Sequence, residues 1–279
     1  MKGFALGQYY PADSVMHRLD PRAKVICALA YIVASFLCRN FYAFVLLLVS
    51  AILLILISKI PLKIVFRSIK ALIFIMAFTA VLNIFWYTPE KDIEPLFQWH
   101  FVTVYEGGLY NALFILVRIT AMVIGTSIFL TYTTSPIALT DAIEELLRPL
   151  AKIKVPVHEF AMMMTIALRF IPTIVDETDK IMSAQKARGA DFTTGGLAQR
   201  AKALVPVIIP LFASAFRRAG ELAIAMECRC YHGGEGRTKF RVLKFHFRDV
   251  VAFLFPLCFI ASIVLINVFG MRYGWLYSM

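Results

Sequence analysis

Four long apolar segments decide what this chain can fold into. Each approaches the about 20 residues that a helix needs to cross the roughly 30 Å hydrocarbon core of a bilayer. Arg118 is the only charged side chain within them. The segments are Phe41–Ile57, Ala71–Tyr87, Leu109–Thr131 and Val250–Phe269. They predict a polytopic membrane protein built from helices.

Composition excludes the other broad classes of protein. Hydrophobic residues make up 60% of the chain and charged residues 17%, whereas soluble domains are about 45–50% apolar and about 25% charged. The 24 Phe and 11 Tyr offer far more buriable surface than a disordered chain carries.

A fifth, shorter span is predicted at Val25–Cys38. Lys24 and Arg39 must snorkel at its ends for it to reach across the bilayer. The predicted fold class is therefore an all-α integral membrane protein with about five transmembrane helices, together with two long cytoplasmic amphipathic helices.

The distribution of charge predicts the orientation. The connection between the second and third spans is basic and has no acid, whereas Thr88–Gly108 carries four acids against Lys91 alone. The basic residues are Lys59, Lys63, Arg67 and Lys70. Because cytoplasmic loops are rich in Lys and Arg, the N-terminus is expected in the cytoplasm, and Thr88–Gly108 and the C-terminus outside. The net charge of +11 is attributed to this orientation, and no nucleic-acid partner is expected.

The same topology places Tyr132–Arg248 in the cytoplasm. Ser135 as N-cap and Pro136 at the first helical position predict a short helix there. Two long amphipathic helices are predicted to follow, at about Val157–Ala190 and Leu197–Tyr231. The chain then divides into residues 1–131 with four transmembrane helices, residues 132–248 as the cytoplasmic helical region, and residues 249–279 with the last transmembrane helix.

No catalytic or metal-binding motif stands out. The sequence contains no G-x-x-x-x-G-K-[ST], H-E-x-x-H or G-x-S-x-G, the signatures of phosphate-binding loops, zinc proteases and hydrolases. Cys228, Cys230 and His232 lack a fourth zinc ligand. Two pairs of adjacent acids, Glu144-Glu145 and Asp176-Glu177, are interpreted as solvated faces of amphipathic helices. The chain is therefore predicted to be a non-enzyme with no cofactor or metal of its own.

Arg118 and Asn83 are the clearest polar side chains within the predicted spans. A charge near the middle of a span is costly, so Arg118 is expected to face a neighbouring span or a partner and to contact backbone carbonyls or Asn83.

Both long helices end on an arginine between small residues. Ala187-Arg188-Gly189 closes the first, and Cys228-Arg229-Cys230 closes the second. An arginine at a helix C-terminus can simply cap it, since it favours the negative end of the helix dipole. Small neighbours also let a guanidinium approach another protein closely. The residue types alone leave capping and docking open.

These segments resemble the energy-coupling factor (ECF) transporter transmembrane T component, the EcfT/CbiQ family. The likeness rests on Ala184–Phe192 (AQKARGADF), on the proline-bearing apolar run after it, and on Ala225–Tyr231 (AMECRCY). It extends upstream through Leu168–Pro172 (LRFIP) and Thr133–Pro136 (TTSP), and covers most of the chain.

The resemblance implies a coupling role in an ABC importer of the prokaryotic cell membrane. In that family the arginines of the two signatures dock into grooves of two cytoplasmic ABC ATPase subunits, of the EcfA and EcfA′ type, which bind the ATP and Mg. A separate membrane protein, the S component, binds the vitamin or similar micronutrient and packs on the same helices. The docking role thereby falls on Arg188 and Arg229, framed by Ala187, Gly189, Cys228 and Cys230. Cysteine replaces the usual Ala and Gly around Arg229, and it is small enough to preserve the close approach.

Two alternatives come from other classes of protein. One is a self-contained intramembrane enzyme with a site near Arg118, and the other is a conventional channel-forming ABC permease. Both need polar groups inside the spans, and Arg118 and Asn83 are too few for a hydrated pathway or an acid–base pair.

Overall fold

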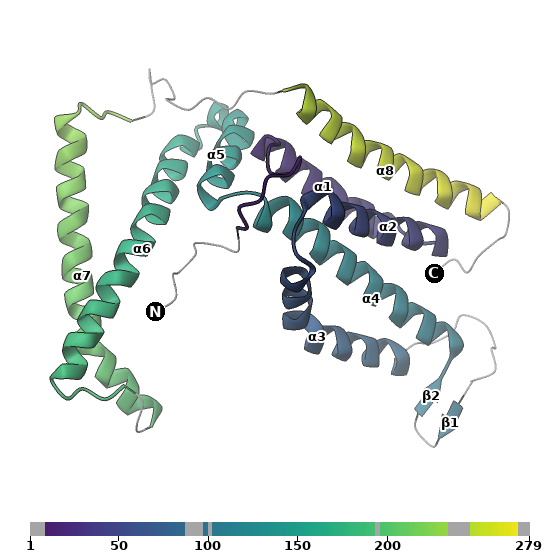
Figure 1. Ribbon diagram of the computed structural model, residues 1–279, viewed down its shortest axis with the longest axis horizontal. Helices are drawn as coiled ribbons and strands as arrows, with labels where there is room; N and C mark the ends of the chain where they lie inside the picture. The colour runs from purple at the N-terminus through teal and green to yellow at the C-terminus, as the bar shows by residue number, and fades with distance from the viewer. Residues whose placement is uncertain (1–8, 87–96, 100–101, 193–195, 234–245, 273–279) are drawn as a thin grey trace. The chain divides into compact units, whose positions relative to one another are not determined.

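The computed structural model describes residues 9–86, 97–99, 102–192, 196–233 and 246–272 (Figure 1). It is an all-α membrane protein, as predicted, with one short antiparallel hairpin. The helices are α1 (Pro21–Leu37), α2 (Phe41–Ser58), α3 (Leu62–Phe85), α4 (Glu106–Thr126) continued by the π-helix η1 (Ser127–Tyr132), α5 (Pro136–Leu147), the 3-10 helix η2 (Arg148–Ile153), α6 (Val157–Ala187), α7 (Leu197–Cys228) and α8 (Phe247–Arg272). The hairpin pairs β1 (Phe97–Trp99) with β2 (Val102–Val104), within the predicted external loop. Residues 88–96, 100 and 101 of that loop lie outside the described residues.

The chain forms two compact units. We call Gly7–Ala142 with Leu243–Met279 the bundle unit, because it contains α1 to α4 and α8. We call Met1–Leu6 with Ile143–Val242 the long-helix unit, because it contains α6 and α7.

The core of the bundle unit is centred on α1. Tyr31 is 1% exposed, and its ring stacks on Phe259 of α8 at 5.8 Å between centroids. Gly125 of α4 lies directly against the same ring: a Cβ added there would be 2.2 Å from Cε1 of Tyr31. The absence of a side chain at position 125 therefore sets how closely α4 approaches α1.

Helix α3 begins earlier than predicted. The sequence placed Lys63, Arg67 and Lys70 in a loop and began the span at Ala71, but the helix starts at Leu62, directly after Pro61. Lys and Arg are good helix formers, so the helix extends beyond its apolar part. Similarly, α4 begins at Glu106 rather than Leu109.

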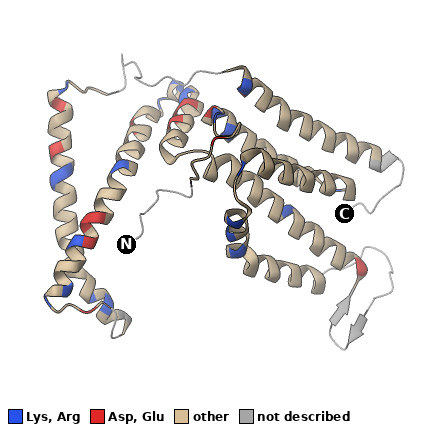
Figure 2. Ribbon diagram, in the orientation of Figure 1, with Lys and Arg blue, Asp and Glu red and all other residues tan. Residues whose placement is uncertain are grey.

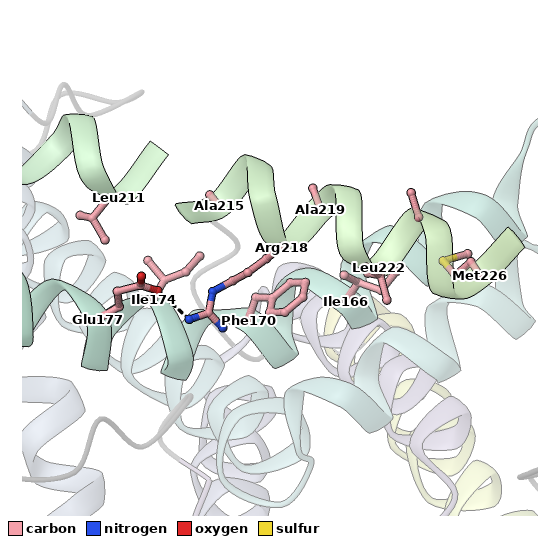
Figure 3. A pocket seen from close by; sticks show the side chains of 11 residues that line it. Ile166, Phe170, Ile174, Glu177, Leu211, Ala215, Arg218, Ala219, Leu222 and Met226 are labelled. Atoms are coloured by element: carbon pink, nitrogen blue, oxygen red, sulfur yellow. Dashed lines mark hydrogen bonds and ion pairs between the residues drawn. The ribbon is translucent and has the colours of Figure 1, made fainter. Parts of the chain in front are cut away.

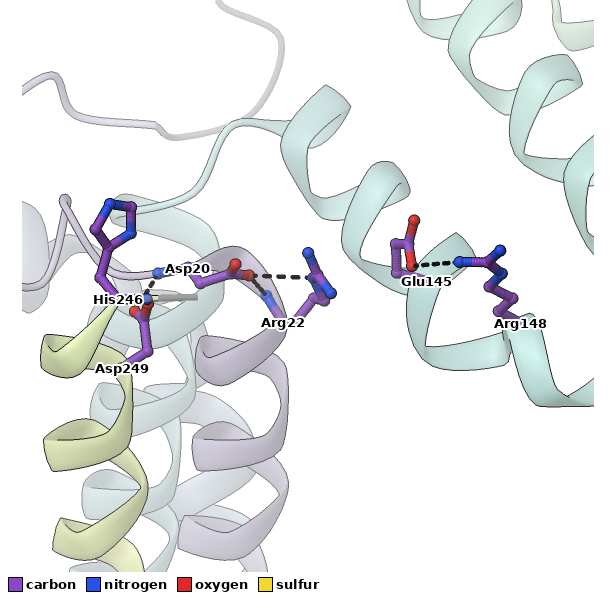
Figure 4. Close-up of polar contacts among 6 residues, drawn as sticks. All are labelled: Asp20, Arg22, Glu145, Arg148, His246 and Asp249. Atoms are coloured by element: carbon purple, nitrogen blue, oxygen red, sulfur yellow. Dashed lines mark hydrogen bonds and ion pairs between the residues drawn. The ribbon is translucent and has the colours of Figure 1, made fainter. Parts of the chain in front are cut away.

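Polar contacts join the ends of several helices in the bundle unit (Figure 4). The Asp249 carboxylate, 2% exposed at the start of α8, accepts a 2.7 Å hydrogen bond from the backbone N–H of Asp20, before α1. The ammonium of Lys24, also 2% exposed, donates at 2.7 Å to the carbonyl of Thr133, just after η1. The chain therefore leaves the bundle after η1 and returns to it at α8 at the same end, where α1 begins.

This geometry limits the path of the intervening region. Among the residues that the structure describes, six helices are long and apolar enough to cross a membrane, judged by length and composition: α2, α3, α4 with η1, α6, α7 and α8. Helix α1, with 17 residues, is not among them. Because the region between η1 and α8 starts and finishes at one end of the bundle, it either stays on one side or crosses twice. Its cytoplasmic placement stays a prediction.

Candidate functional site

Helices α6 and α7 pack against each other through apolar stripes. On α6, Ile166, Phe170 and Ile174 recur every four residues, so they lie on one face. On α7 the facing side chains include Leu211, Ala215, Ala219, Leu222 and Ala223. Together they line a groove of about 300 Å³ (Figure 3). The small alanines allow the two helices to approach closely here.

A polar cluster closes one part of this groove, and we call it the α6–α7 clasp. The carboxylate of Glu177 accepts a hydrogen bond from Arg218 Nη2 at 2.9 Å (Figure 3). It also accepts one from Ser214 Oγ at 2.5 Å. Ser214 is 6% exposed, and the side chain of Glu177 is 22% exposed. The clasp therefore fixes how α6 and α7 sit against each other.

Asp176 and Glu177 were interpreted as part of a solvated helix face, and this interpretation was wrong for Glu177. The spacing of Glu177 could have indicated its contact with α7: it follows Ile174 by three residues and Phe170 by seven, which places it on the stripe that faces α7. The other acid pair is also engaged. Glu144 accepts from His158 at 3.0 Å, and Glu145 lies 3.9 Å from Arg148 (Figure 4).

The C-terminus of α6 is a Schellman motif, a backbone arrangement that ends a helix. The helix ends at Ala187, three residues before the predicted Ala190, and Arg188 is its C-cap. Gly189 adopts a φ of 85°, which favours glycine. Its N–H donates to the carbonyl of Lys186, and that of Ala190 donates to the carbonyl of Gln185, both at 3.0 Å. These are the two hydrogen bonds that define the motif.

The C-terminus of α7 repeats this motif. The helix ends at Cys228, three residues before the predicted Tyr231, with Arg229 as C-cap. Cys230 takes the left-handed position with a φ of 55°, where glycine is usual. Its N–H donates to the carbonyl of Glu227 at 2.8 Å, and that of Tyr231 donates to the carbonyl of Met226 at 3.0 Å. The sequence found the two arginines, but the matched backbone geometry emerges only in the structure.

The backbone motif leaves both arginine side chains available. Two carbonyls near the end of each helix accept backbone N–H groups in these motifs, so they do not need the guanidinium as a cap. Arg188 and Arg229 are exposed, and within the described ranges neither has a side-chain hydrogen bond or ion pair to this chain. In this geometry neither guanidinium is hydrogen-bonded to the end of its own helix. The flanking Ala187, Gly189, Cys228 and Cys230 are exposed as well, so both signatures are accessible.

Arg118 has a different setting, at the C-terminal end of the short helix α1. Its guanidinium donates at 2.8 Å to the carbonyl of Cys38, the C-cap of α1, and lies over the ring of Phe44 at 5.2 Å. Asn267 of α8 donates at 2.7 Å to the neighbouring carbonyl of Leu37. Carbonyls at a helix end have no partner within the helix, and in lipid an unsatisfied one is costly. Arg118 therefore lets α1 end among the other helices.

The structure gives Asn83 no part in this arrangement. Its amide donates at 2.8 Å to the carbonyl of Thr79, one turn earlier in its own helix. Of the two partners expected for Arg118, backbone carbonyls or Asn83, the structure shows a backbone carbonyl, that of Cys38. In the parts of the chain that the structure describes, no three His, Cys, Asp or Glu side chains are grouped to hold a metal ion.

Comparison with known proteins gives consistent similarities. The profile of the CbiQ family, described as cobalt transport protein, matches residues 12–240. The chain is 51% identical over 265 residues to the energy-coupling factor transporter transmembrane protein EcfT of Clostridium kluyveri, covering 95% of this chain and 97% of that one. It is 46% identical over 267 residues to the EcfT protein of Ruminiclostridium cellulolyticum, covering 96% and 98%. The EcfT protein of Bacillus subtilis is 47% identical over 249 residues, covering 89% and 92%.

Proposed function

Since the chain belongs to the CbiQ family and is a transmembrane component of an energy-coupling factor transporter, we propose that it transmits motion between partner subunits. The motion begins in two cytoplasmic ATPase subunits, which bind and hydrolyse ATP. It ends in a membrane S component, which carries a vitamin or similar micronutrient. The chain itself performs no catalysis and binds no cofactor.

One observation carries this proposal: two paired helices present matched, exposed arginines. Arg188 and Arg229 are both C-caps of Schellman motifs, on helices held together by the α6–α7 clasp. A planar guanidinium can donate several charge-assisted hydrogen bonds to a groove lined by carboxylates or carbonyls. Two such anchors on a connected pair of helices would convert a movement of the two ATPases into a shift of α6 and α7 together.

The surroundings of the intramembrane polar residues count against the two alternatives. Arg118 is engaged by a helix end, and Asn83 by its own helix. Neither is left to line a hydrated channel or to act with a second group as acid and base. A self-contained enzyme or permease should work as the purified chain alone, whereas the proposed coupling subunit should require its partners.

Co-purification tests this proposal directly. The chain, extracted in a mild detergent, should bring down two nucleotide-binding subunits and a small membrane protein, and the assembly should hydrolyse ATP in proteoliposomes. Substrate turnover or transport by the chain in isolation would contradict the coupling role.

The N-terminus and the region from Tyr132 to Arg248 are proposed to lie in the cytoplasm. The native thiols of Cys228 and Cys230 are exposed and report on this placement. We expect a membrane-impermeant maleimide to leave them unmodified in intact cells, and to react after permeabilisation of cells that make this chain without the ATPases. A Cys228→Ser Cys230→Ser variant is the control for labelling elsewhere, and thiol-specific labelling in intact cells would reverse the orientation.

A further inference from the structure

The first turns of α3 carry three basic side chains on one face, and we call them the basic stripe. Lys63, Arg67 and Lys70 are spaced by four and three residues, so they are neighbours on the helix surface. All three are exposed. Figure 2 shows this cluster of blue on α3.

The basic stripe has no acidic counterpart within the chain. Among the described residues, no Asp or Glu forms an ion pair with Lys63, Arg67 or Lys70. Like charges three and four residues apart on a helix repel each other. A ligand with negative charge would relieve this repulsion.

Packing fixes which way the basic stripe faces. On the other side of the same turns, Val65 is 4% exposed, Ser68 hydrogen-bonds with the hydroxyl of Tyr132, and the carbonyl of Ile64 accepts from the same hydroxyl. Tyr132 is at the end of η1, so these contacts hold α3 against the bundle. The basic stripe is thereby held on the outer face.

The surface around the basic stripe is apolar and continues into the membrane-spanning part of the helix. Leu62, just before Lys63, is 57% exposed, and Phe66, between Lys63 and Arg67, is 65% exposed. Phe74, one turn beyond Lys70, is 79% exposed. Helix α3 has 24 residues and is about 36 Å long at 1.5 Å per residue, more than the roughly 30 Å of hydrocarbon. The charged side chains are confined to the first nine residues of the helix, and the 15 residues from Ala71 to Phe85 are uncharged. When this uncharged part lies in the hydrocarbon, the long side chains of Lys63, Arg67 and Lys70 extend to the headgroups at this end of the helix.

We propose that the basic stripe binds the headgroups of anionic phospholipids. Ammonium and guanidinium groups at headgroup depth attract phosphate, and the fork of Arg67 can hold two of its oxygens. Exposed Leu62 and Phe66 pack against the first carbons of the acyl chains. The inference applies whichever side of the membrane this end of the bundle faces, so it stands apart from the proposed function.

Spin-labelled lipids test the proposal with the intact chain in phosphatidylcholine nanodiscs. Electron paramagnetic resonance measures how much labelled phosphatidylglycerol, relative to labelled phosphatidylcholine, is immobilised at the protein surface. We expect a preference for phosphatidylglycerol that weakens with salt. The triple variant Lys63→Gln, Arg67→Gln, Lys70→Gln should reduce this preference by about fivefold or more.

Two matched variants separate a site from a general effect of charge. Lys152→Gln, Lys154→Gln, Lys180→Gln removes the same charge from exposed positions of the long-helix unit and should keep the preference. The second variant, Lys63→Arg, Arg67→Lys, Lys70→Arg, keeps the charge of the basic stripe and should also keep the preference for phosphatidylglycerol. An unchanged preference in the triple Gln variant, or an equal loss in the first control, overturns the proposal.

A local reporter covers the case in which the triple Gln variant fails to insert. Phe66→Trp places an indole between the cations, and its fluorescence, corrected for the native tryptophans, should be quenched more by brominated phosphatidylglycerol than by brominated phosphatidylcholine. Equal quenching overturns the proposal. The proposal is also overturned if the triple Gln variant keeps its lipid preference but no longer co-purifies with other subunits. That result would show that the basic stripe binds an acidic protein surface.

Discussion

The double variant Arg188→Ala Arg229→Ala is expected to insert normally and to lose uptake. Truncating an interface anchor of this kind typically costs ~2 kcal/mol or more of binding, which is about 30-fold in affinity. Each single variant should weaken association of the ATPases or uncouple hydrolysis from uptake, and the double variant should do both more severely. Pull-down of the ATPases, ATP hydrolysis and substrate uptake measure these effects.

The geometry of the helix ends predicts that folding is spared. The hydrogen bonds of both Schellman motifs are between backbone groups, so truncating Arg188 or Arg229 leaves them intact. Arg200→Ala, at an exposed position in the first turn of α7, is the matched control and should retain activity.

Lysine substitutions distinguish docking from capping of the helix dipole. Arg→Lys should rescue poorly at either docking position, because an ammonium keeps the charge and loses the planar fork. Capping contributes only ~0.3–1 kcal/mol and is satisfied by either cation. Full activity of both lysine variants would favour capping, and full activity of the double alanine variant would exclude docking.

Gly125→Ala should destabilise the bundle unit strongly for so small a change. The new Cβ would lie 2.2 Å from Cε1 and 2.5 Å from Cδ1 of Tyr31. The ring cannot easily move away, since it is 1% exposed and stacked on Phe259. Overpacking a core usually costs ~1–3 kcal/mol. We expect a lower yield of folded protein and a lower melting temperature in detergent.

Gly220→Ala is the matched control for this substitution. Gly220 lies within α7, and nothing is within 4 Å of a Cβ added there. Alanine is favoured over glycine in a helix by roughly 0.5–1 kcal/mol, so this variant should be neutral or slightly stabilised. Combining Gly125→Ala with Tyr31→Leu should recover part of the loss. Equal melting temperatures for the two alanine variants would show that the close approach of α4 and α1 is unimportant.

The sequence predicted those parts of the fold that depend on hydropathy and on local signals. The apolar spans, the N-cap at Ser135 and the pair of long helices all follow from such patterns. Ser135 Oγ indeed accepts from the N–H of Ala138 at 3.3 Å. The early start of α3 was missed because hydropathy reports only the apolar part of a helix.

The contacts at the site that the sequence did not predict join segments far apart in the chain. Glu177 was interpreted as solvated because its partners, Ser214 and Arg218, lie 37 and 41 residues later, on α7. The partner of Arg118 is a backbone carbonyl 80 residues away, and no pattern of side chains identifies such a group. The left-handed conformation of Cys230 could not be predicted from the sequence, because glycine is the residue usually found in that conformation at a helix end.

The hydrogen bond between Asp20 and Asp249 has a consequence for synthesis. The two residues are separated by 229 positions, so the first helix meets its last neighbour only when the ribosome has nearly finished the chain. Until then, the face of α1 that packs on α8, including Tyr31, remains uncovered in the bilayer. A nascent or truncated chain without α8 therefore leaves that face of α1 open to lipid or to other proteins, in contrast to the complete protein.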